Sequence, residues 1–76
     1  MNTLLTLHAV SALFARQRTA IYADIQQGVF PRPIKIGRSS RWPSHEVDEI
    51  IASRIAGKND EEIRQLVAEL EAKRRK

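Results

Sequence analysis

The chain has 76 residues, no cysteine and a net charge of +4, a size that forms one small domain and argues against a large catalytic cavity. The lack of cysteine excludes disulfides, thiolate metal sites and cysteine nucleophiles, and an intracellular protein fits best. Residues 1–7 have neither a basic start nor a long apolar run, so we predict no signal peptide, no membrane span and a cytoplasmic location.

The positive charge is concentrated in the first half of the chain. Residues 1–43 hold six Lys or Arg and one Asp, a net charge of +5, whereas residues 44–76 hold seven Lys or Arg and eight Asp or Glu, a net charge of −1. A basic half of this kind suits a polyanionic partner, although many basic faces are only solvated. Nucleic acid is therefore the partner that we expect.

Two short helices with a tight link are predicted first. Apolar residues recur at helical spacing over residues 6–14, with Thr6 as N-cap, and again over residues 18–27, which end before Gly28. A second helix that opens with cations is what a helix-turn-helix requires, because its first residues are presented to base edges. The alternative is an ordinary corner between two helices.

Candidate DNA contacts lie around the start of this second helix: Arg16, Gln17, Arg18, Thr19 and Tyr22. A guanidinium such as that of Arg18 binds guanine N7 and O6, and a Thr bonds a base edge or contacts a methyl group. The Tyr22 hydroxyl suits a phosphate, but an aromatic beside Ile21 is as often partly buried.

Residues 28–42 predict a small β-hairpin. Ile34 and Ile36 alternate with Lys35, so a strand places the two aliphatic side chains on one face and the ammonium group on the other. Residues 37–40 are predicted as the turn, since Gly tolerates positive φ and Ser bonds its own backbone.

This hairpin carries cations and no carboxylate, which favours contacts with the DNA backbone and minor groove over a merely solvated loop. Trp42, before the proline that starts the next helix, is predicted to be a core residue. The candidate contacts of the hairpin are Arg32, Lys35, Arg38, Ser39, Ser40 and Arg41.

A third helix is predicted from the N-cap Ser44 to Gly57, with an apolar stripe. Its early carboxylates suit the helix dipole and need no catalytic role. The stripe contains Val47, Ile50, Ile51 and Ile55, and the carboxylates are Glu46, Asp48 and Glu49.

A fourth amphipathic helix follows the N-cap Asn59. Its apolar stripe must cover either this domain's own core or a second copy of the chain. The reversal that residues 57–59 permit favours folding back onto the third helix, so we expect a monomer that self-associates mainly on DNA. The stripe contains Ile63, Leu66, Val67 and Leu70.

The chemistry of an enzyme is not evident. His8 and His45 stand alone, without the spacing of metal ligands, and the glycines are turn and cap residues rather than a phosphate cradle. We therefore predict no catalytic residue, no metal, no cofactor and no small-molecule substrate.

Two motifs together resemble the AlpA family of phage and prophage regulators. Residues 18–22, Arg-Thr-Ala-Ile-Tyr, are similar to the family's Arg-Ser-Thr-Ile-Tyr, and residues 28–37 follow the family's pattern nearly throughout. The Arg41-Trp42 pair and the helix start at residues 44–47 are also similar. The resemblance covers most of residues 1–57 and implies a winged helix-turn-helix related to excisionases and to the DNA-binding domain of MerR regulators.

The link between the first two helices departs from this pattern. Where the family usually has Thr-Gly-Leu-Ser, residues 14–17 are Phe-Ala-Arg-Gln, without the turn glycine, the buried leucine and the serine cap. We expect Phe14 to fill the space of the absent leucine and Arg16 to point outward as a further phosphate contact. Residues 58–76 extend beyond the usual end of such domains.

The sequence thus predicts a mainly α-helical fold with a small β-hairpin: a winged helix-turn-helix domain over residues 1–57 and a C-terminal helical extension over residues 58–76. We expect sequence-selective binding to double-stranded DNA, by several copies together, in a prophage transcriptional regulator or excisionase (recombination directionality factor) that is nucleoid-associated when bound. The alternative is a protein-binding adaptor or inhibitor that acts on an integrase, a polymerase subunit or another regulator. RNA binding is a third option, but the sequence lacks the exposed aromatic platform on which RNA bases stack.

Overall fold

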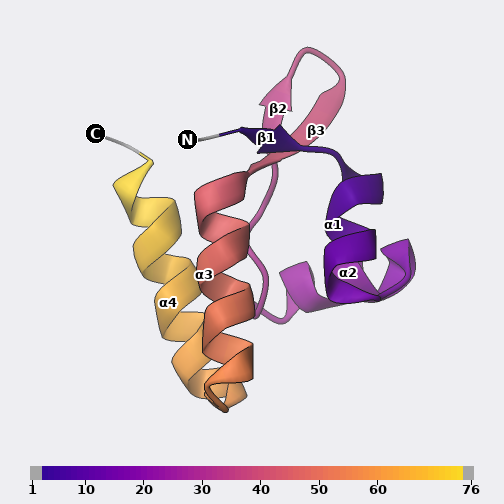
Figure 1. The fold of residues 1–76 in the computed structure, drawn as a ribbon. Coiled ribbons are helices and arrows are strands. Elements are labelled where there is room, and N and C mark those ends of the chain that lie inside the picture. The colour runs from indigo at the N-terminus through magenta and orange to yellow at the C-terminus, as the bar shows by residue number, and fades with distance from the viewer. Residues whose placement is uncertain (1–2, 75–76) are drawn as a thin grey trace.

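A computed structural model of the protein describes residues 3–74. These residues form four helices and three short strands, in the order β1 (Leu4–Leu5), α1 (Leu7–Phe14), α2 (Arg18–Gln26), β2 (Ile34–Ile36), β3 (Ser39–Pro43), α3 (Ser44–Ile55) and α4 (Asp60–Lys73). Helices α1 and α2 lie to one side of the antiparallel α3–α4 pair, and the strands lie above them (Figure 1). The fold is a winged helix-turn-helix with a further C-terminal helix, as predicted. In the described region, no helix has the length and apolar run needed to cross a membrane.

Helices α1 and α2 have the boundaries that their end signals predict. The Thr6 hydroxyl accepts a hydrogen bond from the Ala9 amide at 3.1 Å, which satisfies one free N–H of the first turn of α1. Gly28 lies just beyond α2 with φ of +81°, a conformation that ends a helix and that glycine adopts without strain.

The turn between α1 and α2 keeps its geometry without a glycine. Ala15 has φ of +53°, in the left-handed region. Its amide donates to the Ala12 carbonyl at 3.2 Å, and the Arg16 amide donates to the Ser11 carbonyl at 3.1 Å. These two bonds form the Schellman motif, which satisfies the last carbonyls of a helix. Ala15 therefore occupies a position that favours glycine.

The sheet has one strand more than the predicted hairpin. Strand β1 pairs antiparallel with β3, and Leu4 lies opposite Pro43. Next to this pair, the Thr3 amide donates to Ser44 Oγ at 2.9 Å and the Ser44 amide donates to the Thr3 carbonyl at 2.7 Å. The prediction that Ser44 caps α3 is wrong, because its hydroxyl is engaged by the β1 segment; Pro43 is the N-cap and makes no side-chain bond.

The hairpin loop is shorter than predicted. Ile36 lies opposite Ser39, so the loop consists of Gly37 and Arg38 alone. Gly37 has φ of +61°, and two-residue loops of type II′ place glycine at this first position. Ser39 and Ser40 belong to β3 rather than to the turn, because the strand ladder continues through them.

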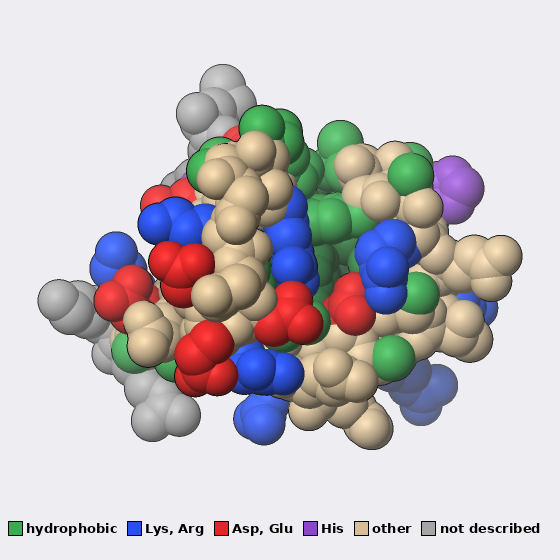
Figure 2. All heavy atoms as spheres, turned by 90° about the horizontal axis from the view of Figure 1, so that it is seen from below, with side chains coloured by type: hydrophobic (Ala, Val, Ile, Leu, Met, Phe, Trp, Pro, Cys, Tyr) green, Lys and Arg blue, Asp and Glu red, His purple; other side chains and the backbone are tan. Residues whose placement is uncertain are grey.

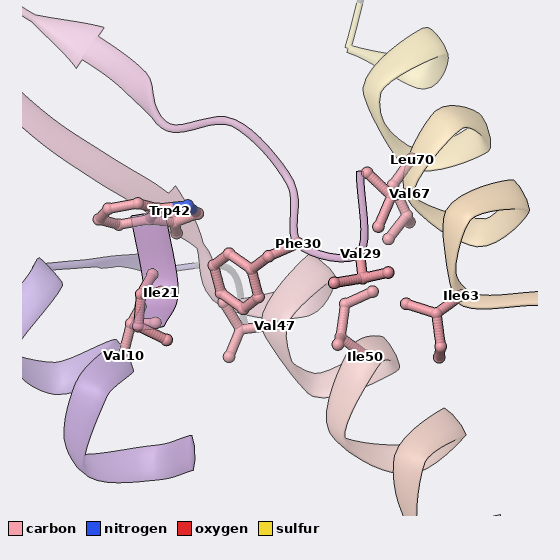
Figure 3. Close-up of a cluster of buried hydrophobic side chains, with 10 residues drawn as sticks. All are labelled: Val10, Ile21, Val29, Phe30, Trp42, Val47, Ile50, Ile63, Val67 and Leu70. Atoms are coloured by element: carbon pink, nitrogen blue, oxygen red, sulfur yellow. The ribbon is translucent and has the colours of Figure 1, made fainter. Parts of the chain in front are cut away.

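One hydrophobic cluster connects nearly all of the elements (Figure 3). Trp42 is fully buried, as predicted, and its Nε1 donates to the Pro31 carbonyl at 2.9 Å. The Phe30 ring lies between helices and sheet, with ring centroids 5.1 Å from Phe14 and 6.2 Å from Trp42. The cluster consists of Val10, Ile21, Val29, Phe30, Trp42, Val47, Ile50, Ile63, Val67 and Leu70.

Helix α4 folds back onto α3 and shares this cluster through Ile63, Val67 and Leu70. The chain reverses at Gly57, where φ is +85°. Asn59 and Glu62 then form a capping box, with bonds of 2.9 and 3.1 Å between the side chain of each and the backbone N–H of the other. Ile55 was predicted in the buried stripe of α3 but is 82% exposed, since it lies at the end of α3 on a different side from Ile50.

A buried ion pair joins the start of α3 to the end of α4. Glu46 is only 1% exposed, and its carboxylate accepts from Arg74 Nε at 2.8 Å and from Arg74 Nη2. The sequence indicated only a helix-dipole role for Glu46. In the fold this carboxylate needs its cation, because an unpaired buried charge is strongly destabilising.

Replacing Ala15 with glycine should stabilise the protein. The Ala15→Gly variant relieves the left-handed strain of a side chain with a Cβ atom, and we expect the free energy of unfolding to rise by about 0.5–1 kcal/mol. Urea denaturation measures the change. The control Ala12→Gly, inside α1, should lower the free energy of unfolding by about 1 kcal/mol. A loss of stability in Ala15→Gly would contradict the left-handed turn.

Removing the Arg74 cation should be costly. The Arg74→Met variant keeps most of the apolar stem but leaves the Glu46 carboxylate buried without a partner, so we expect the free energy of unfolding to fall by about 2–4 kcal/mol. The neighbouring cation Lys73 is exposed, and the control Lys73→Met should change stability by less than about 0.5 kcal/mol. Equal effects of the two substitutions would show that the pair does not hold α4.

Candidate nucleic-acid interface

One side of α2 faces solvent along its whole length. Ile21 is buried on the opposite side, and Asp24 and Ile25 are half-buried beside it. The outer face has no carboxylate and presents side chains that hydrogen-bond to bases and phosphates. It consists of Arg18, Thr19, Tyr22, Ala23 and Gln26.

Gln26 is a candidate that the sequence analysis missed. It is exposed at the end of α2, four residues after Tyr22 and eight after Arg18, so helical periodicity places it on the same face. A carboxamide can bond adenine N6 and N7 together, which makes Gln26 chemically as suitable as Thr19. Counting one helical turn on from Tyr22 in the sequence would have identified Gln26.

The start of α2 is open. Its N-cap Gln17 makes no side-chain bond to the first turn, and the first turn contains no acidic residue. The free N–H groups and the positive end of the helix dipole therefore remain available to a negatively charged group. Arg18 and Thr19 are exposed beside them.

Arg16 is not a free cation. Its guanidinium lies against α2, where Nε is 2.9 Å from Asp24 Oδ2 and Nη2 donates to Asp24 Oδ1 at 3.1 Å. The Arg16 side chain is 46% exposed, so it reaches solvent although its guanidinium is already paired. A phosphate contact through Arg16 would share the guanidinium with this carboxylate.

Beside this pair lies a groove of ≈ 500 Å³. On the face seen from below, hydrophobic side chains form its floor and charged side chains flank it (Figure 2). Phe14 lines the groove and packs edge-on against Phe30, with 85° between the rings. An ion pair borders the groove on each side, Arg16 with Asp24 and Arg54 with Asp60 at 3.0 Å.

The hairpin spreads its candidate residues over different faces. Arg38 is exposed in the two-residue loop, at the tip. Lys35 and Ser40 lie opposite each other, and Lys35 Nζ donates to Ser40 Oγ at 2.8 Å. Arg41 lies opposite Ile34 on the other face, half-buried, and its Nη1 donates to the Ser40 carbonyl at 2.9 Å. Ser39 shares that face, since it is two residues before Arg41.

Arg32 lies outside the hairpin, in the extended segment that precedes β2. Its side chain is exposed, and its backbone amide donates to Glu71 Oε2 of α4 at 2.8 Å. The structure therefore brings Lys35 and Ser40 together, places Arg38 alone at the tip, and separates Arg32 from the other hairpin cations.

Comparison with protein families gives a match over residues 3–55 to the family described as Prophage CP4-57 regulatory protein (AlpA). The chain belongs to the AlpA family. The match spans the helix-turn-helix, the hairpin and α3, and it ends before α4. Comparison with curated proteins and with solved structures gives no significant match.

The AlpA match includes every predicted contact residue, from Arg16 to Arg41. The family is one of prophage regulatory proteins by its description. The departures at residues 14–17 lie within the matched region, and the structure shows how they are accommodated: Ala15 takes the left-handed turn, Arg16 pairs with Asp24, and Gln17 leaves α2 without a side-chain cap.

A serine at the N-cap of α2 should stabilise the protein. In Gln17→Ser, a short hydroxyl can accept from the second or third amide of the helix, which Gln17 does not do, and we expect the free energy of unfolding to rise by about 0.5–1 kcal/mol. Thermal unfolding measures it. Gln17→Ala, which has no acceptor, is the control and should bring no gain. A stability equal for both variants would mean that water already satisfies these amides equally well.

Proposed function

We propose that the chain binds double-stranded DNA sequence-selectively, with the outer face of α2 in the major groove and the tip of the hairpin on the flanking backbone or minor groove. The observation that carries this proposal is the composition of that exposed face, which opens with Arg18 at the free start of the helix and contains no carboxylate. Membership in a family of prophage regulators supports it.

Each polar side chain of the face has a role that its chemistry suits. The Arg18 guanidinium matches guanine N7 and O6, Gln26 matches adenine, and the Thr19 methyl or hydroxyl contacts a neighbouring base. Tyr22 is 45% exposed, which frees its hydroxyl for a phosphate. Together they discriminate over a few base pairs.

The hairpin contributes affinity. Arg38 at the tip enters a narrow minor groove or contacts its phosphates, and Lys35 supports it from one face of β2. Phosphate contacts of this kind position a protein without selecting a sequence. The proposed interface thus divides selectivity and affinity between α2 and the hairpin.

Regulation of transcription or of recombination direction in a prophage is the role that we propose for this binding. A module of this size buries about 600–1,000 Å² and recognises few base pairs, so several copies on repeated sites are needed for useful specificity. Self-association on DNA and contact with an integrase are compatible with this role.

Two single substitutions separate selectivity from affinity. Binding to a duplex selected from a random library, and to a scrambled duplex, is measured by fluorescence anisotropy over a range of salt concentrations. Arg18→Ala should cost about 1–3 kcal/mol on the selected duplex and relax base preference. Arg38→Ala should weaken binding to both duplexes by similar factors. It should also make the slope of log affinity against log salt concentration shallower by about one unit.

Lys58→Ala is the control, since it also removes one positive charge but lies at the turn between α3 and α4, away from the sheet (Figure 1). It should leave both affinities nearly unchanged. If Arg18→Ala weakens binding to every duplex equally, Arg18 contacts the DNA backbone rather than a base. No selection of any duplex by the unmodified protein would overturn the proposal and favour a protein-binding adaptor.

A further inference from the structure

The segment between α2 and the hairpin is held at its first end by α4. Arg64 Nε donates to the carbonyl of Gln27, the C-cap residue of α2, at 2.8 Å. The Arg64 stem also covers Gly28, with Cγ 3.6 Å from the position of a Cβ atom there. A cation on a free C-terminal carbonyl is a favourable helix cap. Helix α4 therefore holds the C-terminal end of α2 in place.

The second end of the same segment is Pro31-Arg32-Pro33, which leads directly into β2. Proline has a fixed φ and no N–H group, so Arg32 carries the one backbone donor of this tripeptide. That donor is bound by Glu71 Oε2 of α4 at 2.8 Å, and the Pro31 carbonyl is bound by Trp42 Nε1 at 2.9 Å. The stiff tripeptide is thus attached to α4 on one side and to the sheet on the other.

Both attachments come from one face of α4. Arg64 and Glu71 are seven residues apart, about two helical turns, so they project from the same side. Val67 and Leu70 lie between them and pack beside Val29 of the segment (Figure 3). A single rigid helix therefore contacts the end of α2, the middle of the segment and the start of the hairpin.

We infer that α4 positions the hairpin relative to α2, and that Glu71 is the positioning residue that attaches the hairpin side. Helix α4 lies outside the region matched by the family, so the family match does not account for its contacts. The functional consequence rests on the proposed DNA binding: two contact elements held in place before association lose less conformational entropy when they bind.

The first test needs no DNA. In Glu71→Ala the Arg32 amide loses its acceptor, so its hydrogen exchange should accelerate and residual dipolar couplings should show a changed hairpin orientation relative to α2. Glu71→Gln retains an oxygen acceptor and should restore both. Glu69→Ala, an exposed carboxylate on α4, is the charge-matched control. Unchanged couplings in Glu71→Ala would overturn the inference.

The second test is a double-mutant cycle on the selected duplex. Glu71→Ala should weaken binding about three- to tenfold compared with Glu69→Ala, and Glu71→Gln should bind like Glu69→Gln, because only the alanine removes the acceptor. In an Arg38→Ala background the loss caused by Glu71→Ala should largely disappear, since the positioned hairpin no longer makes its contact.

The outcomes separate the two proposals. If the unmodified protein selects no duplex, or Arg38→Ala has no effect on any duplex, the proposed DNA interface is wrong, whatever the couplings show. If Arg38→Ala weakens binding but the effect of Glu71→Ala is undiminished in that background, the interface stands and α4 does not act through the hairpin. A general loss of stability would appear as equal weakening in both backgrounds and also overturns the positioning role.

Discussion

The buried hydrogen bond from Trp42 to Pro31 is the contact on which the other parts of the fold depend. Trp42 lies in β3, which pairs with both other strands. Its indole donates to a carbonyl in the segment that leaves α2, and its ring packs near Phe30, which in turn contacts Phe14 of α1. One side chain therefore connects the sheet, the linking segment and the helix-turn-helix. Without the Pro31 carbonyl as acceptor, the Trp42 N–H group would be an unsatisfied donor inside the core.

Ion pairing explains where the excess positive charge is exposed. Within residues 3–74, five cations form ion pairs with carboxylates: Arg16, Arg54, Lys58, Arg64 and Arg74. In that described region, the cations of the α2 face and the hairpin tip, Arg18 and Arg38, take part in none of these pairs. Four of these pairs involve α3 or α4 and one holds Arg16 against α2, whereas the positive charges of Arg18 and Arg38 stay available to a partner. Carboxylates of the protein therefore compete little with a polyanion for these cations.

The link between α1 and α2 shows how tertiary contacts preserve a turn whose local residues are unfavourable. Ala15 accepts a left-handed conformation, and Gln17 provides no side-chain cap. Each of these two features costs about 0.5–1 kcal/mol of stability relative to a glycine or a serine cap. Burial of Phe30 against Phe14 and the Arg16–Asp24 pair lie on either side of the turn and stabilise it. The chain therefore forms a defined left-handed turn here without a glycine or a side-chain cap.

Local residues were enough to predict the helices, because Thr6, Gly28, Gly57 and Asn59 act on residues within one turn of themselves, and to predict Trp42 in the core; the cap expected at Ser44 was wrong. The sequence also predicted the hairpin and the family. The DNA contacts and the domain boundary at residue 57 stay predictions. The bond between Thr3 and Ser44, 41 residues apart, and the pair of Glu46 with Arg74, 28 residues apart, became visible only in the folded chain. Such partners depend on how elements pack in space, which no local spacing encodes.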